Sequence, residues 1–320
     1  MTAEWRKNEQ PGALAEEALL LVRRAPAAAW AGYLACSVPF VLALLYFWTD
    51  MSRGAQAYER CAPAALGLAA LFIAMKTGQA YFTALLLDTL AQRTRPWSLR
   101  RVLRMAAVQG AMQPWSLFVL PVALLLLYPF VPVHGFFQAW TAFGDGETAN
   151  LKQIRGRAWS LAMQDLRPQA FTLWLASPWL LGAGMAAAFG TVRMMELIAS
   201  GGAVHNAEWF GIGAVLFTLF AGLLSPLGFA LTVNIGILFA TIPALLRIFL
   251  GWETLFSISG FYALTNTTFL AALFGVAYLC MDPVMKAAYA LRAFRAESRH
   301  NGRDILVAIR DMRDAREAAP

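Results

Sequence analysis

Long apolar stretches alternate with short charged stretches along the whole chain. The longest of them, 209–246, contains no charged residue, and a helix needs roughly 20 apolar residues to cross a bilayer. The pattern therefore predicts an all-α fold, a polytopic transmembrane helix bundle of about seven to eight membrane segments. The expected segments are 27–48, 63–87, 114–131, 133–143, 169–192, 208–224, 227–249 and 261–281.

Two of these segments leave alternatives open. The segment 133–143 is short and follows Pro129 and Pro132. It is either a short helix that returns the chain across the membrane or a re-entrant element. A re-entrant element is tolerated only where protein covers its backbone, because lipid cannot satisfy free N–H and C=O groups. The segment 208–224 is separated from 227–249 by Ser225 and Pro226, and whether it forms a full span stays open.

Composition agrees with a membrane protein, and the charge pattern predicts its orientation. The chain is 59% hydrophobic and 14% charged, whereas soluble domains carry about 25% charged residues. The segments 1–26, 88–113, 145–169 and 282–320 hold 21 of the 26 Lys and Arg residues. Positive charge stays on the cytoplasmic side, so we expect a multi-pass protein of the cytoplasmic (inner) membrane with both termini cytoplasmic. This orientation requires 133–143 to return the chain.

A layout of three parts recurs three times along the chain. A short basic amphipathic helix comes first, a proline follows, and an apolar span comes last. The helical parts are EEALLLVRRA, LRRVLRMAAVQGAMQ and LKQIRGRAWSLAMQDLR. A helix with one basic and one apolar face lies in the headgroup plane. Pro26, Pro114 and Pro168 are therefore expected to mark turns into the bilayer, with all three amphipathic helices on the cytoplasmic side.

The ends of the chain fit the same interpretation. We expect an amphipathic cytoplasmic segment at 1–26, a single transmembrane domain at 27–281 and an amphipathic cytoplasmic tail at 282–320. In the tail, Asp282 and Lys286 have the spacing of an ion pair along a helix, and Asn301-Gly302 predicts a helix end. Basic residues next to spans favour membrane lipids as partners, with no nucleic acid. The candidate headgroup contacts are Arg23, Arg24, Arg100, Arg101, Arg104, Lys152, Arg155, Lys286 and Arg292.

The layout resembles the membrane-domain family of glycerophosphodiester phosphodiesterases and the related YciC-like stand-alone bacterial membrane proteins, in an uncharacterised branch. The resemblance is best over 227–298, where Asp282, Pro283, Lys286, Tyr289 and Arg292 look like the end of the family's last span. It breaks at about 192–225, where this chain carries an insertion. The family implies serial units of an amphipathic helix and a hairpin. It implies no agreed activity, and the chain lacks the soluble phosphodiesterase domain.

The sequence contains no pattern typical of catalysis. Walker loops, dinucleotide fingerprints, HExxH motifs, nucleophile elbows and CxxC pairs are all absent. The histidines, His134, His205 and His300, have no carboxylate or second histidine at ligand spacing. We therefore expect no enzyme, no metal and no cofactor.

Polar residues inside the spans form the candidate intramembrane site. Lys76, Gln79 and Thr83 make one stripe of the second span, and Asn234 and Asn266 lie in two late spans. Such residues either line a cavity for an anionic headgroup or substrate, or snorkel and join helices.

Three functions remain open. The first is a non-enzymatic scaffold or accessory protein that organises lipid or another membrane or cytoplasmic protein. The alternative is a transporter or lipid-handling protein with a polar midplane site. The least supported is an enzyme that acts on lipid, because no acids or histidines cluster near an interface.

Overall fold

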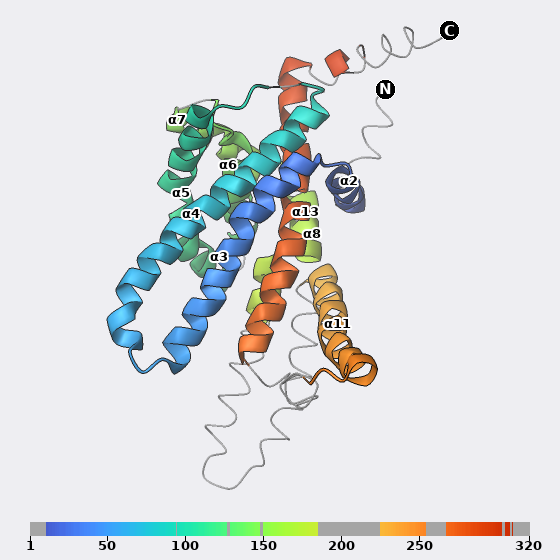
Figure 1. Ribbon diagram of the computed structural model, residues 1–320. Helices are drawn as coiled ribbons and strands as arrows, with labels where there is room; N and C mark the ends of the chain where they lie inside the picture. Colours follow the sequence, from blue (N-terminus) through green and yellow to red (C-terminus); the bar gives the residue numbers. More distant parts are fainter. Residues whose placement is uncertain are drawn as a thin grey trace. The chain divides into compact units, whose positions relative to one another are not determined.

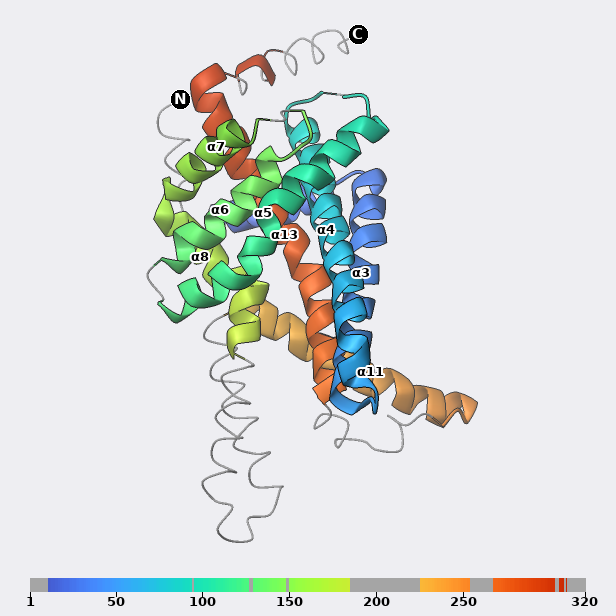
Figure 2. The same ribbon diagram turned by 90° about the vertical axis from the view of Figure 1, so that its left-hand side faces the viewer.

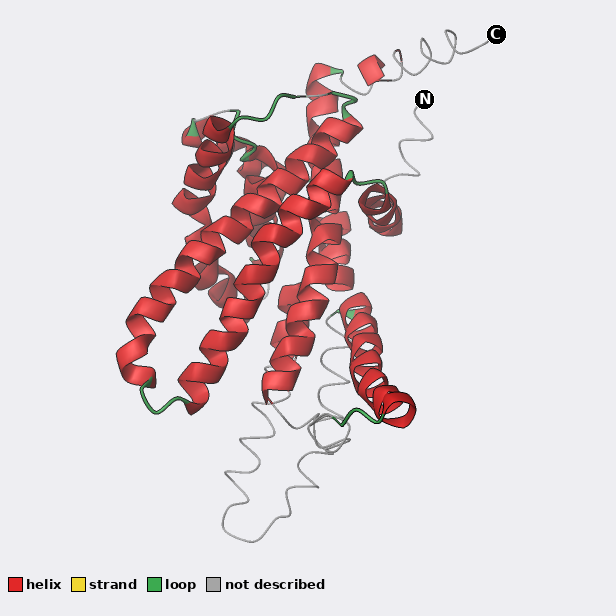
Figure 3. Ribbon diagram, in the orientation of Figure 1, coloured by secondary structure: helices red, strands yellow, loops and turns green. Residues whose placement is uncertain are grey.

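The computed structural model describes residues 11–93, 95–126, 129–147, 150–184, 225–253, 267–302, 305–307 and 309. Every regular element among these residues is a helix, which confirms the all-α prediction for them (Figure 3). The segment 208–224, Asn266 and His205 lie outside the described residues. The labelled helices of Figure 1 are α2 (Pro11–Arg23), α3 (Ala27–Arg53), α4 (Ala57–Leu90), α5 (Leu99–Leu125), α6 (Phe130–Phe143), α7 (Leu151–Met163), α8 (Leu166–Ala176), α11 (Pro226–Leu250) and α13 (Thr267–Asn301).

Five of the described helices are long and apolar enough to cross a membrane. By length and composition they are Ala27–Met51, Ala57–Leu90, Leu99–Leu125, Pro226–Leu250 and Phe269–Arg299.

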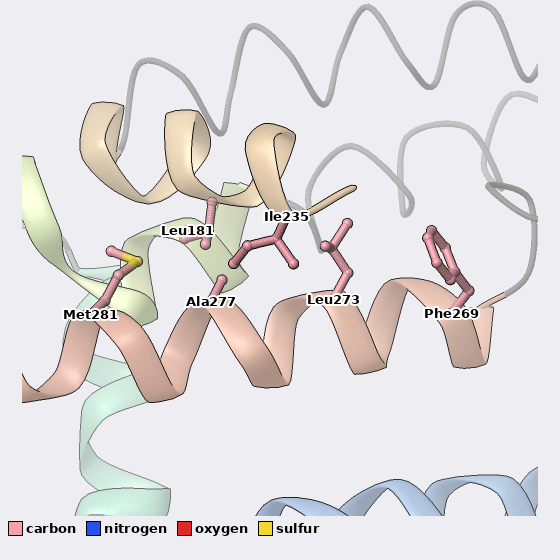
Figure 4. Packing of buried hydrophobic residues seen from close by; sticks show 6 residues of the cluster. All are labelled: Leu181, Ile235, Phe269, Leu273, Ala277 and Met281. Atoms are coloured by element: carbon pink, nitrogen blue, oxygen red, sulfur yellow. The ribbon is translucent and has the colours of Figure 1, made fainter. Parts of the chain in front are cut away.

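The chain divides into two compact units. The first unit contains Met1–Leu44, Tyr58–Thr172 and Pro283–Pro320, and the second contains Leu45–Ala57 and Leu173–Asp282. An apolar cluster forms the core of the second unit, where α11 and α13 meet the helical residues 178–184 (Figure 4). A side chain at Gly228 would place its Cβ 2.5 Å from the end of Met281, so this glycine permits the close approach of the two helices. The cluster comprises Leu181, Ile235, Phe269, Leu273, Ala277 and Met281.

The portions of α3 and α4 that belong to the first unit, up to Leu44 and from Tyr58, lie side by side as arms of a hairpin (Figures 1 and 2). Two glycines permit the close approach. A Cβ at Gly32 would lie 2.5 Å from the ring of Tyr81, and one at Gly78 would lie 2.6 Å from Cys36 Cβ. Small residues at helix crossings are typical of membrane proteins, where close van der Waals packing replaces the hydrophobic effect between helices.

We therefore expect Gly78→Leu to destabilise the hairpin. Overpacking a tight contact costs about 1–3 kcal/mol, which should lower the melting temperature in detergent by several degrees. Gly67→Leu is the matched control, because a Cβ at Gly67 of the same helix meets nothing within 4 Å. Equal melting temperatures for the two variants would contradict the close crossing.

The predicted break at Pro114 is wrong. Helix α5 continues through Pro114 and Pro121, so the basic segment and the apolar span form one helix. Transmembrane helices tolerate prolines where neighbouring helices and hydroxyl side chains support the backbone. Here the Ser116 hydroxyl donates to the Gln113 carbonyl at 2.6 Å, and the Gln113 amide donates to the Phe137 carbonyl of α6 at 3.1 Å.

Of the other two predicted helix breaks, the one near Pro26 is found where it was predicted, whereas the other comes before Pro168. Helix α2 ends at Arg23 and α3 begins at Ala27, so the break near Pro26 is confirmed. The break between α7 and α8 comes at Gln164 and Asp165, before Pro168. Pro168 lies in the first turn of α8, where the missing N–H costs no helical hydrogen bond. The expected span 169–192 is also interrupted, because the helix breaks at Ser177.

Helix α6 covers the short segment predicted at 133–143. It runs from Phe130 to Phe143, and every residue from His134 to Phe143 is buried. Helices α5 and α7 pack against it. The backbone of this short helix is thus covered by protein, as a short or re-entrant element requires. At the other end of the chain, α13 ends at Asn301 and Gly302 has a φ of +59°, which confirms the predicted helix end.

Candidate functional site

A strongly basic pocket lies in the first unit. It measures about 610 Å³ and is formed by α2, the turn between α7 and α8, and the last turns of α13. We call it the arginine pocket, because four arginines and only one carboxylate line it. Its residues are Leu14, Leu161, Met163, Gln164, Asp165, Leu166, Arg167, Pro168, Arg292, Arg295, Ala296 and Arg299.

Arg292 holds the wall of this pocket in place. Its side chain is 7% exposed and donates to the carbonyls of Leu161 at 3.0 Å and Gln164 at 2.6 Å. It also donates to Gln169 Oε1 at 2.6 Å. The last carbonyls of a helix have no partner within the helix. One guanidinium therefore satisfies the end of α7 and ties α7 and α8 to α13.

The other three arginines are more open to a ligand. Arg295 pairs with Glu17 of α2. Arg299 lies 3.6 Å from Asp165, and both side chains are 57% exposed. Arg167 is exposed and forms no ion pair with any described residue. Exposed ion pairs contribute about 0–1 kcal/mol, so an anionic ligand can replace Asp165 at Arg299 at little cost. The pair of Arg295 and Glu17 is only partly exposed. Positive charge exceeds negative charge in the pocket.

The remaining wall of the arginine pocket is apolar. Leu14, Leu161 and Pro168 line it, while Met163 and Leu166 are partly exposed at 49% and 39%. A free phosphate ion would contact only the arginines. A molecule with an anionic head and an apolar body would contact both parts, so the pocket fits an anionic amphiphile.

A second pocket of about 450 Å³ lies where α4 ends. We call it the aspartate pocket, after the buried Asp88. The guanidinium of Arg95 pairs with Asp88, with Asp145 at 2.8 Å and with Glu147 at 2.7 Å. Partial burial opposes the ionisation of Glu147, but the hydrogen bond and charge of Arg95 outweigh burial and lower its pKa. The pocket is lined by Pro26, Leu85, Asp88, Thr89, Gln92, Arg93, Arg95 and Trp97.

Two arginines of α5 fix the loop that carries Asp145 and Glu147. Arg101 donates to the Asp145 carbonyl at 2.9 Å, and its guanidinium lies 4.0 Å from the ring centre of Trp97. Arg104 donates to the carbonyls of Gly146 and Glu147 at 3.1 and 3.0 Å. These bonds place the carboxylates beside Arg95.

A hydrogen-bond chain runs from α13 into α6. The Lys286 ammonium, 1% exposed, donates to Gln138 Oε1 at 2.6 Å. Gln138 Nε2 lies 3.3 Å from His134 Nε2. Because an ammonium only donates, the glutamine oxygen must accept and its amide nitrogen must donate. His134 therefore accepts at Nε2, and the network assigns its proton to Nδ1.

The predicted intramembrane residues make bonds within their own helices. Lys76 donates to Gln79 Oε1 at 3.2 Å and Thr83 donates to the Gln79 carbonyl at 2.8 Å, both within α4. Asn234 donates to the Ala230 carbonyl of α11 at 2.7 Å. Lys76, Gln79 and Thr83 thus lie next to one another in the first unit, whereas Asn234 belongs to the second unit. Their role at a cavity stays a prediction.

The predicted headgroup contacts differ in exposure. Five of them are exposed, and Arg104 is half-buried. Arg101, Lys286 and Arg292 are buried and bonded to protein atoms. The predicted headgroup contacts omit three arginines of the pocket, Arg167, Arg295 and Arg299. The spacing of 292, 295 and 299, which places three arginines on one helix face, could have found two of them. The exposed five are Arg23, Arg24, Arg100, Lys152 and Arg155.

Comparisons with known proteins were made for the whole chain. No family model, no curated protein and no solved structure matches it.

Proposed function

We propose that this protein is a non-enzymatic scaffold or accessory protein of the cytoplasmic membrane that binds anionic lipid in the arginine pocket. The observation that carries the proposal is the charge of that pocket: four guanidiniums stand against Asp165 and the neighbouring Glu17. Basic pockets beside membrane helices are typical binding sites for anionic headgroups. The apolar residues of the same pocket would receive the start of an acyl chain.

Three structural features support a binding role. Arg292 is fully engaged by protein acceptors and keeps the pocket formed. Arg167 and Arg299 lie at its exposed side and are available to a phosphate. Asp165 has a φ of +47°, a backbone conformation that costs a non-glycine residue of the order of 1 kcal/mol or more and that recurs at ligand sites.

The finer topology belongs to the same proposal. We propose about seven to eight membrane segments, with both termini in the cytoplasm and the basic helices α2 and α7 in the headgroup plane. Exposed Leu19 and Leu20 on α2 and exposed Trp159 on α7 would enter the lipid. Kinship with the membrane domains of glycerophosphodiester phosphodiesterases is likewise a proposal, supported by the sequence of the last span.

Lipid binding in nanodiscs tests the proposal. We expect the wild-type chain to prefer phosphatidylglycerol to phosphatidylcholine, as measured by native mass spectrometry of retained lipid. The double variant Arg167→Gln/Arg299→Gln should weaken phosphatidylglycerol binding about tenfold, because it removes two charge-assisted contacts. Inorganic phosphate should compete poorly if the apolar wall contributes.

The matched control is the double variant Arg23→Gln/Arg24→Gln. It removes the same charge from two exposed arginines at the end of α2 and beyond it, which are candidate contacts at the bilayer surface but do not line the pocket. The control therefore compares loss of charge inside the pocket with loss of charge at the surface. We expect it to change phosphatidylglycerol binding by less than about threefold. An equal loss in both doubles would attribute binding to general charge, and no preference for phosphatidylglycerol in the wild type would refute the proposed function.

A further inference from the structure

We propose that the aspartate pocket binds the headgroup of a lipid that carries a primary ammonium, of the phosphatidylethanolamine type. Its ammonium would bind Asp88, and its phosphate would lie beside Arg93. This site is separate from the arginine pocket and does not depend on the function proposed for it.

The end of α4 builds the pocket. Gln92 has a φ of +47°, in the left-handed region that glycine usually occupies after a helix. The Gln92 N–H donates to the Thr89 carbonyl at 3.2 Å, and the Arg93 N–H donates to the Asp88 carbonyl at 2.9 Å. This capping turn brings Gln92 and Arg93 back beside the last turn of α4. Asp88, Gln92 and Arg93 therefore line one pocket.

One of the two carboxylate oxygens of Asp88 has no hydrogen-bond donor among the described residues. Oδ1 accepts from Arg95, but Oδ2 is buried and has no hydrogen-bond partner among the described residues. A buried acceptor without a donor is unfavourable. A ligand that brings an N–H group into the pocket would give this oxygen a donor.

The chemistry of the pocket favours an ammonium with N–H groups over other cations. Among the described residues no group of three His, Cys, Asp or Glu side chains could hold a metal ion. A quaternary ammonium has no N–H to donate to Asp88, and it is usually held on open aromatic faces. The ring of Trp97 is already covered by the guanidinium of Arg101 at 4.0 Å. Tyr81 packs against the same ring, with centroids 4.4 Å apart.

The position of the pocket favours a lipid over a soluble amine. Asp88 lies in the last turn of α4, one of the five helices long enough to cross a membrane. The end of such a helix reaches the depth of the headgroups. Leu85, Pro26 and Trp97 supply apolar wall beside the charged groups. A phosphoethanolamine head places an ammonium and a phosphate two carbons apart, and Asp88 and Arg93 offer one partner for each.

A headgroup series in nanodiscs tests the inference on the whole chain. Phosphatidylethanolamine has three N–H groups, its N,N-dimethyl form has one, and phosphatidylcholine has none. We expect retention to fall stepwise along this series, with about tenfold between its ends. Equal retention of all three lipids by the wild type would overturn the inference without any variant, so a variant that fails to fold leaves it falsifiable.

The variants then assign the preference to Asp88. Asp88→Asn should abolish the preference for phosphatidylethanolamine. Asp145→Asn should keep it, because Asp145 also pairs with Arg95 but does not line the pocket. Phosphatidylglycerol binding should survive Asp88→Asn, and the ethanolamine preference should survive Arg167→Gln/Arg299→Gln. If the preference for phosphatidylethanolamine were lost in Arg167→Gln/Arg299→Gln but kept in Asp88→Asn, this inference would be overturned. The proposed function would then still stand.

Discussion

Replacing Arg292 with alanine should destabilise the first unit by about 3 kcal/mol, because three acceptors lose one donor group at once. These acceptors are the carbonyls of Leu161 and Gln164 and the side-chain oxygen of Gln169. With the guanidinium gone, the Leu161 carbonyl keeps only the Gln164 N–H at 3.3 Å, the Gln164 carbonyl loses the donor it has here, and α8 loses its link to α13. The melting temperature in detergent should fall by roughly 5–10 °C.

Two further variants test whether the hydrogen bonds of the Arg292 guanidinium, and not its positive charge alone, stabilise the first unit. Arg299→Ala should cost less than about 1 kcal/mol, because its ion pair is exposed. Arg292→Lys keeps the charge, but a single ammonium cannot reproduce the planar fork of a guanidinium. We therefore expect the lysine variant to lose most of the stability that the alanine variant loses. If Arg292→Ala melts within a degree of Arg299→Ala, the guanidinium does not hold the α7–α8 turn.

The second large effect is expected at Gln138, the acceptor of the buried Lys286 ammonium. Gln138→Leu should cost about 2–3 kcal/mol, because a charged donor loses a hydrogen bond in a buried place. Adding Lys286→Met should recover at least about 1 kcal/mol of that loss, since removing both polar groups is cheaper than removing one. The double variant should thus be more stable than Gln138→Leu alone in thermal unfolding.

A parallel cycle controls for general effects of changing a buried glutamine. Gln113 is also buried, but it bonds to Phe137 and Thr141 of α6 and not to Lys286. Gln113→Leu and Lys286→Met should therefore add within about 0.5 kcal/mol. If the stability losses of Gln138→Leu and Lys286→Met were additive as well, the buried hydrogen bond between Lys286 and Gln138 would contribute no coupling energy.

Five of the eight predicted segments overlap the described helices that are long and apolar enough to cross a membrane, but the predicted ends of these helices are less accurate. The apolar pattern places the start of α3 at residue 27, and it places α11 at 227–249 against Pro226–Leu250. Hydropathy marks where a helix can lie in lipid, but a helix can continue past that region. For this reason α13 extends through Pro283 to Asn301, where the sequence predicted a span that ends at 281.

Proline was a poor guide to helix ends in this chain. Pro114 and Pro121 lie inside α5, and Pro63 lies inside α4. Whether a proline ends a helix depends on partners elsewhere in the chain. Helix α5 packs against α6, whose Trp140 indole donates to the Val108 carbonyl of α5 at 3.1 Å. Such support comes from residues tens of positions away and leaves no local signal.

The two pockets were harder to predict than the helices. Basic residues near spans were recognised as candidate headgroup contacts, but exposure divides them into bonded and open groups, and only the fold reveals exposure. Arg292 and its acceptors at 161, 164 and 169 are far apart in sequence. The aspartate pocket depends on a capping turn at Gln92, where no glycine marks the left-handed conformation.

The continuous course of α5 determines how far its basic end reaches. Its 27 residues extend for about 40 Å at 1.5 Å per residue, whereas the hydrocarbon layer is about 30 Å thick. If its apolar end lies near one boundary of that layer, about 10 Å of rigid helix projects beyond the other. Arg100, Arg101 and Arg104 lie in this projecting portion. Because Arg101 and Arg104 donate to carbonyls of the 145–147 loop, a shift of this helix along its axis would move that loop, and the carboxylates it carries, with it.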